Sequence, residues 1–172
     1  MPASVLVGKV GDLFWLRVEG KGCFQNSVHV KQAVKAVVKS GTRNVVVDLE
    51  RCPTMDSTFL GILTCAAVDL KRAGDGNLTV LNLNERNQQL LTSLGLDHVL
   101  HMDADGTSWV EERRLAAQAL ALCEENTDCC KTEQAAHVLE AHKALASTSA
   151  ENECRFRDVI EFLEKELAQK KA

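Results

Sequence analysis

Residues 45–70 constrain the fold most, because they join two different apolar patterns through one short polar loop. The first pattern begins with three consecutive valines at 45–47, and adjacent β-branched residues predict a buried, extended strand. The second pattern is the apolar segment 59–70, whose spacing is helical. These residues therefore predict a strand, a loop and a helix in direct succession.

The loop brings polar side chains to the first turn of the predicted helix. Pro53 ends the extended run, because proline cannot donate to a strand ladder. Asp56, Ser57 and Thr58 are residue types that cap helix N-termini, since their oxygens accept hydrogen bonds from unpaired first-turn N–H groups. The same helix end carries a partial positive charge. It is therefore a suitable place to hold an added phosphate.

The first 106 residues alternate between strand and helix patterns. Short apolar runs predict strands at residues 5–9, 13–19, 44–49, 77–83 and 99–102. Amphipathic segments predict helices at residues 28–39, 57–73 and 85–94, the first with Asn26 and Ser27 as candidate caps. Because strands that alternate with helices form parallel pairs, the expected fold class is α/β, with a mixed sheet of about five strands and helices packed on it. We expect one domain over residues 1–106.

Residues 107–172 contain neither proline nor glycine and no strand pattern, and they predict a C-terminal extension of three helices. The apolar positions expected to face a neighbour are Val110, Leu115, Ala119 and Leu122, then Ala135, Val138, Leu139, His142 and Leu145, then Phe156, Val159, Ile160, Leu163 and Leu167. Such a stripe must be covered by the domain, by the extension itself or by another chain, because exposed apolar faces are costly. A homodimer through the extension is therefore one of three options.

Charge and composition argue against several classes of partner. The net charge is -4, aromatic residues make up 4% of the chain and tyrosine is absent, which disfavours a nucleic-acid-binding surface. No apolar run approaches the roughly 20 residues of a membrane span. The N-terminal residues lack the basic start and long apolar region of a signal peptide. We expect a cytoplasmic protein with no nucleic-acid partner and no membrane span.

The seven cysteines are odd in number, and no Cys/His spacing in the chain is typical of zinc. In a chain long enough to build a core, we expect reduced thiols that pack, with a redox role for Cys52 and Cys65 as the alternative. The residues around Asp56 include no His or Lys that would form a catalytic set with it, and no Walker motif or cofactor fingerprint occurs. We therefore predict no catalytic residue, no metal site and no cofactor.

The same segments resemble the STAS domain of bacterial anti-sigma-factor antagonists. Family members carry an apolar strand that ends in Asp-Leu, then a loop, then Asp-Ser-Ser/Thr-Gly/Ala-Leu-Gly at the start of a helix. Here the strand ends in Asp48-Leu49, and residues 56–61 read Asp-Ser-Thr-Phe-Leu-Gly. The later segment 78–100 is also similar to the family's strand, helix and final strand. The resemblance covers about residues 3–110 and implies a STAS-like fold for the predicted domain.

The resemblance also implies a function. In such proteins the serine after the aspartate, here Ser57, is phosphorylated by a partner anti-sigma serine kinase and restored by a phosphatase. The unphosphorylated form binds the anti-sigma factor and the phosphorylated form does not. Thr58 is the second choice of acceptor, and the alternative interpretation is that both hydroxyls only cap the helix. The residues implied in partner binding are Met55, Asp56, Ser57, Thr58 and Phe59, together with Phe24 and Asn26 in the loop after the second strand.

A second function stays open at this stage. The domain would be an unphosphorylated STAS-like scaffold of a signalling complex, and the helical extension would drive its oligomerisation. In neither interpretation is the chain an enzyme, because the base that deprotonates an acceptor serine belongs to the kinase.

Overall fold

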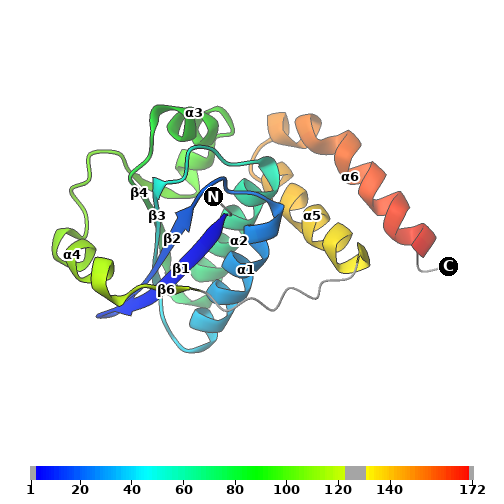
Figure 1. Ribbon diagram of the computed structural model, residues 1–172. Helices are drawn as coiled ribbons and strands as arrows, with labels where there is room; N and C mark the ends of the chain where they lie inside the picture. The colour runs from blue at the N-terminus through cyan, green and yellow to red at the C-terminus, as the bar shows by residue number, and fades with distance from the viewer. Residues whose placement is uncertain (1–2, 123–130, 171–172) are drawn as a thin grey trace.

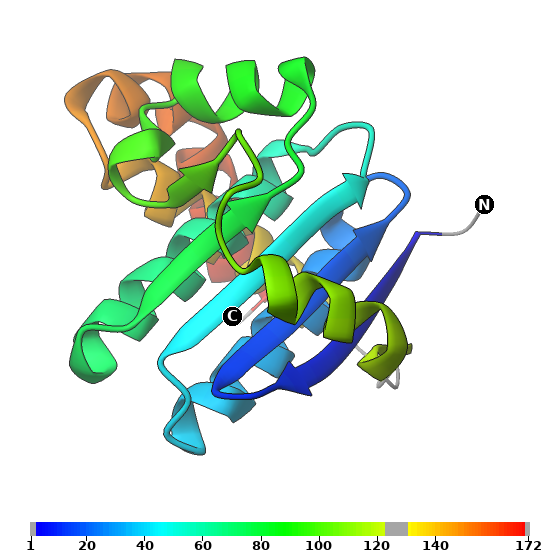
Figure 2. The same cartoon turned by 90° about the vertical axis from the view of Figure 1, so that its left-hand side faces the viewer.

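The structure, a computed structural model, describes residues 3–122 and 131–170. Its centre is a mixed sheet of six strands in the order β5-β4-β3-β2-β1-β6 (Figure 2). The strands are β1 (Ser4–Val10), β2 (Leu13–Glu19), β3 (Asn44–Arg51), β4 (Asn77–Leu81), β5 (His101–Asp103) and β6 (Ala121–Leu122). β1 pairs antiparallel with β2 and β6, whereas β2, β3, β4 and β5 form successive parallel pairs. The hairpin and the crossover connections follow the predicted order of elements.

Helices cover both faces of the sheet (Figure 1). Helices α1 (Phe24–Lys39) and α2 (Ser57–Gly74) pack on one face, and α3 (Glu85–Ser93) with a short 3-10 turn (Leu96–His98) lies near β4 and β5. Helix α5 (Lys131–Ala146) lies on α2, and α6 (Ala150–Lys170) packs on α5 as the outermost layer. On this side the molecule therefore has four layers: sheet, α1 and α2, α5, and α6.

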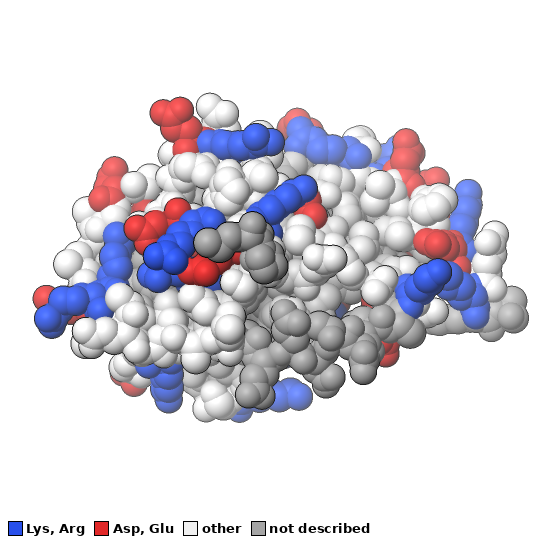
Figure 3. Space-filling view, in the orientation of Figure 1, with Lys and Arg blue, Asp and Glu red and all other residues white. Residues whose placement is uncertain are grey.

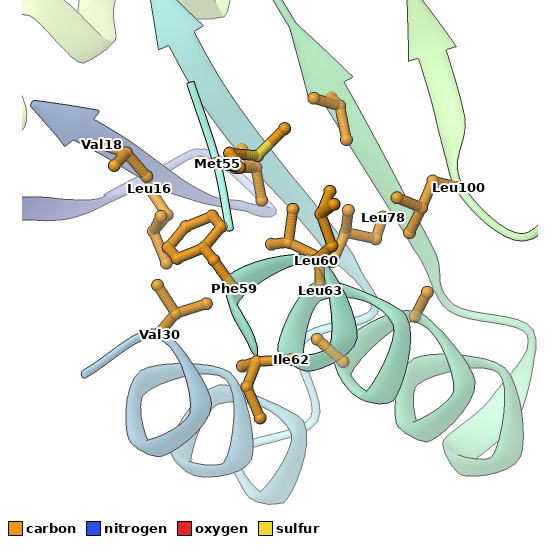
Figure 4. Packing of buried hydrophobic residues seen from close by; sticks show 14 of the residues in the cluster. Leu16, Val18, Val30, Met55, Phe59, Leu60, Ile62, Leu63, Leu78 and Leu100 are labelled. Carbon is orange, nitrogen blue, oxygen red and sulfur yellow. The ribbon is translucent and has the colours of Figure 1, made fainter. Parts of the chain in front are cut away.

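The main core lies between the sheet and helices α1 and α2 (Figure 4). Alternate residues of the strands point into it, because successive side chains of a strand face opposite sides. Leu16 and Val47 come from the sheet, while Phe59 and Leu63 come from α2, and all four side chains are fully buried. The strand and helix predicted around the polar loop thus form the two sides of one core.

Helix α4 (Val110–Ala119) covers the opposite face of the sheet, where it crosses the strands (Figure 2). It contacts the sheet mainly through Ala116, which is buried beside Trp15 and Val46. The apolar stripe predicted for this helix is wrong: Val110, Leu115 and Leu122 are among the exposed large apolar side chains, and Ala119 is exposed too. The flanking residues Trp109 and Leu120, both outside the helix, pack on the sheet instead, so helical spacing does not determine the buried face.

The α/β fold class and the C-terminal helical segment are confirmed, with three differences in detail. The sheet has a sixth strand, because the expected helix at 107–125 ends at Ala119 and β6 pairs with β1 at the sheet edge. Helix α1 begins at Phe24 rather than at residue 28, since Cys23 takes the cap position. α5 and α6 match the expected second and third helices, although residues 123–130 lie outside the described part. In the described residues, no helix is both long enough and apolar enough to cross a bilayer.

Candidate functional site

The N-terminal ends of α1 and α2 lie side by side, held together by backbone hydrogen bonds between the two loops that precede them. The amide of Asp56 donates to the carbonyl of Gly22 (2.8 Å), and the amide of Gly22 donates to the carbonyl of Thr54 (2.9 Å). The Asp56 carboxylate caps α2 by accepting from the amide of Phe59 (2.9 Å), and it also accepts from the amide of Phe24 at the start of α1 (3.3 Å). One carboxylate therefore fixes both helix ends.

Ser57 is the first residue of α2, and its side chain is half-buried. Its Oγ lies 3.0 Å from Nε2 of His142 on α5. The other ring nitrogen, Nδ1, lies 2.8 Å from the carbonyl oxygen of Val138. A carbonyl can only accept, so Nδ1 carries the proton of the neutral ring and Nε2 accepts. The Ser57 hydroxyl therefore donates its hydrogen bond to His142.

A second serine–histidine pair links α5 to the start of α1. The Ser27 hydroxyl donates to the carbonyl of Phe24 (2.7 Å), and its oxygen lies 2.8 Å from Nε2 of His137. Because the single hydroxyl hydrogen is already used, His137 is the donor in this pair. The Phe24 ring packs edge-on against the His137 ring, with 5.7 Å between ring centroids. The two histidines of α5 thus contact the first turns of both helices.

Gly61 lies where α2 and α5 cross. A Cβ atom on this residue would lie 2.2 Å from the carbonyl oxygen of Ala141 and 2.7 Å from its Cα. Glycine in a helix interior costs about 1 kcal/mol relative to alanine, so its presence calls for a packing reason. The sequence predicts Gly61 as a close-packing position, and the backbone contact with α5 confirms it.

Three of the residues predicted to bind a partner are buried in the fold. Phe59 is 0% exposed and Met55 4% exposed, and both belong to the main core, so neither can be a surface anchor (Figure 4). Asn26, 1% exposed, organises the loop: its Oδ1 accepts from the amide of Cys23 (2.8 Å) and its Nδ2 donates to the carbonyl of Lys21 (2.9 Å). Its amide group is therefore used within the fold.

The other predicted site residues lie together. Asp56 is half-buried at the cap of α2 and Ser57 is half-buried on its first turn, Thr58 is buried beside them, and Phe24 is half-buried at the start of α1. Whether these four bind a partner stays a prediction. His137 and His142, the residues that cover them, were not predicted as part of the site. The only sequence signal was the place of His142 in a predicted apolar stripe, which does not say which residue it would contact, and His137 had no such signal.

The surface and the thiols offer little other chemistry. On the face shown in Figure 3, lysine and arginine side chains are interspersed with aspartate and glutamate. Within the described residues, no group of three or more His, Cys, Asp or Glu could hold a metal ion. Burial, together with the carboxylates of Glu140 and Asp69, raises the pKa of the Cys65 thiol to about 11, which keeps it protonated and unreactive. Four cysteines are free thiols, and Cys123, Cys129 and Cys130 lie outside the described residues.

Acid is expected to loosen the contact between α5 and α1. Burial, reinforced by the Lys31 ammonium, lowers the pKa of His137 from 6.5 to about 4, against a smaller opposing effect of Glu140; Lys35 acts in the same direction as Lys31. The folded state thus binds fewer protons than the unfolded one, and the stability from neutral His137 is full above pH 6.5 and lost as the pH falls towards 4. From about pH 7 to about pH 5, we expect the free energy of unfolding to fall about 2 kcal/mol more than in a His137→Gln variant. Urea titrations at both pH values measure this difference, and equal acid sensitivity of the two proteins would contradict it.

The strand, loop and helix that carry Ser57 lie within a region that matches a known protein family. The STAS domain family model matches residues 5–108, which is more than half of the chain. The chain belongs to the STAS domain family. Among curated proteins, no sequence matches it. The match ends before α4, so α4, β6, α5 and α6 lie outside the matched residues.

Solved structures with the same fold include anti-sigma factor antagonists. The Thermotoga maritima protein TM1081 is 21% identical, with a TM-score of 0.55 over 63% of this chain and 93% of that one. The antagonist SpoIIAA in its unphosphorylated form is 14% identical, with a TM-score of 0.52 over 67% of this chain and 97% of that one. The phosphorylated form of SpoIIAA, a Bacillus cell fate determinant, is 16% identical, with a TM-score of 0.51 over 66% of this chain and 99% of that one. At such identities the likeness is one of fold.

Proposed function

We propose that this STAS protein is a regulatory binding module of the anti-sigma-factor-antagonist type, switched by phosphorylation of Ser57 by a partner serine kinase. The observation that carries the proposal is the position of Ser57, a hydroxyl on the first turn of α2 directly after the capping carboxylate of Asp56. In this proposal the protein acts in the cytoplasm, is not an enzyme and uses no cofactor.

The proposed reaction places the chemistry on the partner. The γ-phosphoryl group of ATP passes to Ser57 Oγ, the bond to the leaving ADP breaks, and the hydroxyl proton goes to a base of the kinase. A phosphatase reverses the change by hydrolysis. The first turn of a helix holds the new charge favourably, because its unpaired N–H groups and the helix dipole both attract an anion.

Phosphorylation would act on partner binding by changing the charge of the docking surface. A phosphate adds about -1.5 to -2 charges next to Asp56 at the centre of the proposed docking surface. A partner surface that accepts the neutral hydroxyl would then have to desolvate two adjacent anionic groups. The partners are accordingly an anti-sigma factor that is itself a serine kinase, or is coupled to one, and the matching phosphatase.

Phosphorylation assays test the proposal. With ATP and an anti-sigma-type serine kinase encoded beside this gene, we expect one phosphate per chain at Ser57 by mass spectrometry, and none in a Ser57→Ala variant. A Thr58→Ala variant is the matched control and should still be modified at Ser57. The proposal fails if the kinase binds the protein while leaving Ser57 unmodified.

Binding measurements provide a second arm of the same test. A Ser57→Asp variant should bind the anti-sigma factor at least about tenfold more weakly than the unaltered, unphosphorylated protein does. The reason is that a charge at the centre of an interface is costly to desolvate. Ser40→Asp places the same charge on an exposed residue at the far end of α1 and should leave the affinity unchanged.

A further inference from the structure

Helix α5 covers the part of α2 that carries Ser57. It lies between α2 and α6 in Figure 1, and its residues Ala141 and Leu145 belong to the same buried cluster as the domain core. Both residues are 0% exposed. The match to the family domain ends at residue 108, so this cover comes from a segment outside the matched residues.

Contacts of three kinds hold α5 in place. The backbones of α2 and α5 touch at Gly61 and Ala141, where any side chain on position 61 would overlap α5. The hydroxyls of Ser57 and Ser27 bind the two buried histidines of α5. At the rim, Lys31 of α1 forms an ion pair with Glu140. Two of the three kinds are polar, and buried polar pairs depend on precise geometry more than apolar packing does.

The covered surface and the phosphorylation site are the same place. Transfer to a serine requires its oxygen within about 3 to 3.5 Å of the phosphorus atom, in line with the leaving group. The imidazole of His142 already stands 3.0 Å from that oxygen and accepts its hydrogen bond. A phosphorylated Ser57 would also have no hydroxyl left to donate. A kinase and the docked α5 therefore cannot occupy the Ser57 oxygen at the same time.

We propose that α5 is a cover in cis that competes with the partner kinase for the first turns of α1 and α2. Access to Ser57 requires α5 to leave, which makes the C-terminal segment a second level of control over the switch. The inference rests on the proposed function for the identity of the competitor, while the covering itself can be measured without any kinase.

The Gly61→Ala variant tests the cover at the helix crossing. Alanine favours the helical state of α2 by about 1 kcal/mol relative to glycine, yet its Cβ would overlap the backbone of Ala141. We expect α5 to be displaced while the domain stays folded. The readout is alkylation of Cys65, one turn further along α2, whose Sγ lies 4.0 Å from the carbonyl oxygen of Glu140. Its rate should rise at least about tenfold, while the exposed Cys154 on α6 serves as the internal standard.

A charge-reversal pair tests the same contact without altering the core. Lys31→Glu places two carboxylates opposite each other, and it should speed hydrogen exchange in peptides of residues 131–146. Lys31→Glu combined with Glu140→Lys restores the ion pair in reverse and should return the exchange to the rate of the unaltered protein. The proposal that α5 is a cover would be contradicted by one result. Hydrogen exchange of residues 131–146 and alkylation of Cys65 would both be unchanged in Gly61→Ala and in Lys31→Glu.

The kinase assay then separates the two proposals. If Cys65 becomes accessible and Ser57 is phosphorylated at least about tenfold faster in Gly61→Ala than in the unaltered protein, α5 restricts access. Equal phosphorylation rates in the two proteins, with α5 displaced, would overturn the competition. If no variant is phosphorylated by a kinase that binds the chain, the proposed function fails, and the alkylation and exchange results alone decide whether α5 is a cover.

Discussion

Replacing Phe59 by alanine is expected to lower the free energy of unfolding by about 4 kcal/mol. The ring is 0% exposed and packs between α2, α1 and the sheet (Figure 4). It also lies under the loop before α1, since a Cβ on Gly22 would be only 3.0 Å from the ring. Truncation therefore leaves a cavity in a region that several elements share and that cannot collapse cheaply. Urea denaturation monitored by circular dichroism measures the loss.

Phe162→Ala is the matched control for this prediction. The same side chain on α6 is 66% exposed, and its removal should change the free energy of unfolding by less than about 0.5 kcal/mol. If Phe59→Ala were as mild as Phe162→Ala, the ring would not be a core residue. Its position in the Asp-Ser-Thr-Phe-Leu-Gly motif would then again suggest a contact with a partner.

Replacing Asp48 by alanine should cost about 3 kcal/mol, because it leaves a partly buried cation without its partner. Asp48 lies on β3 and is 0% exposed, and it is on the same face of the strand as Val46, which packs towards α4. Its Oδ2 accepts from Nε of Arg17 (2.9 Å), and its Oδ1 accepts from Nδ2 of Asn82 (2.8 Å). Oδ1 also accepts from the amide of Glu50 (3.1 Å), so both carboxylate oxygens are used within the fold. Urea titration of the variant measures this loss in the free energy of unfolding.

An exposed ion pair between β2 and β3 provides the comparison. Glu19 accepts from Arg51 at 2.9 Å, but the Arg51 side chain is 65% exposed, so Glu19→Ala should cost less than about 1 kcal/mol. Replacing Arg17 by methionine together with Asp48→Leu should recover part of the loss, since an apolar pair of similar volume needs no charge compensation. A loss below about 1 kcal/mol in Asp48→Ala would mean that water reaches Arg17 and that this pair is not a structural requirement.

Local patterns were enough to predict most of the shared domain. The valines of β3, the turn at Pro53 and the cap at Asp56 each act over a few residues, so their conformations follow from nearby chemistry. α4 shows the opposite case. It buries only Ala116 within the helix and relies on Trp109 and Leu120 outside it, so no helical period in the sequence marks its inner face.

The candidate site likewise has a part that the sequence predicted and a part that it did not. The place of Ser57 on the first turn of α2 was predicted, because Asp, Ser and Thr are preferred at helix N-termini. The hydrogen bond between Ser57 and His142 was not predicted. Residues 57 and 142 are 85 positions apart, and their contact depends on how α5 crosses α2 at Gly61. The burial of Phe59 and Met55 was equally open in the sequence, since an apolar residue beside a polar motif suits both a core and an interface.

By itself, the sequence determined that a strand, a capped loop and a helix would present Ser57 at a helix tip within a STAS-like α/β domain. Those features depend on backbone preferences and on hydrogen bonds between residues close in the chain. Only the tertiary structure decided that this hydroxyl is bound by His142, because a contact between distant helices is selected by packing over the whole surface of both. Whether the Ser57 surface is open or covered was therefore settled by α5, and not by the motif.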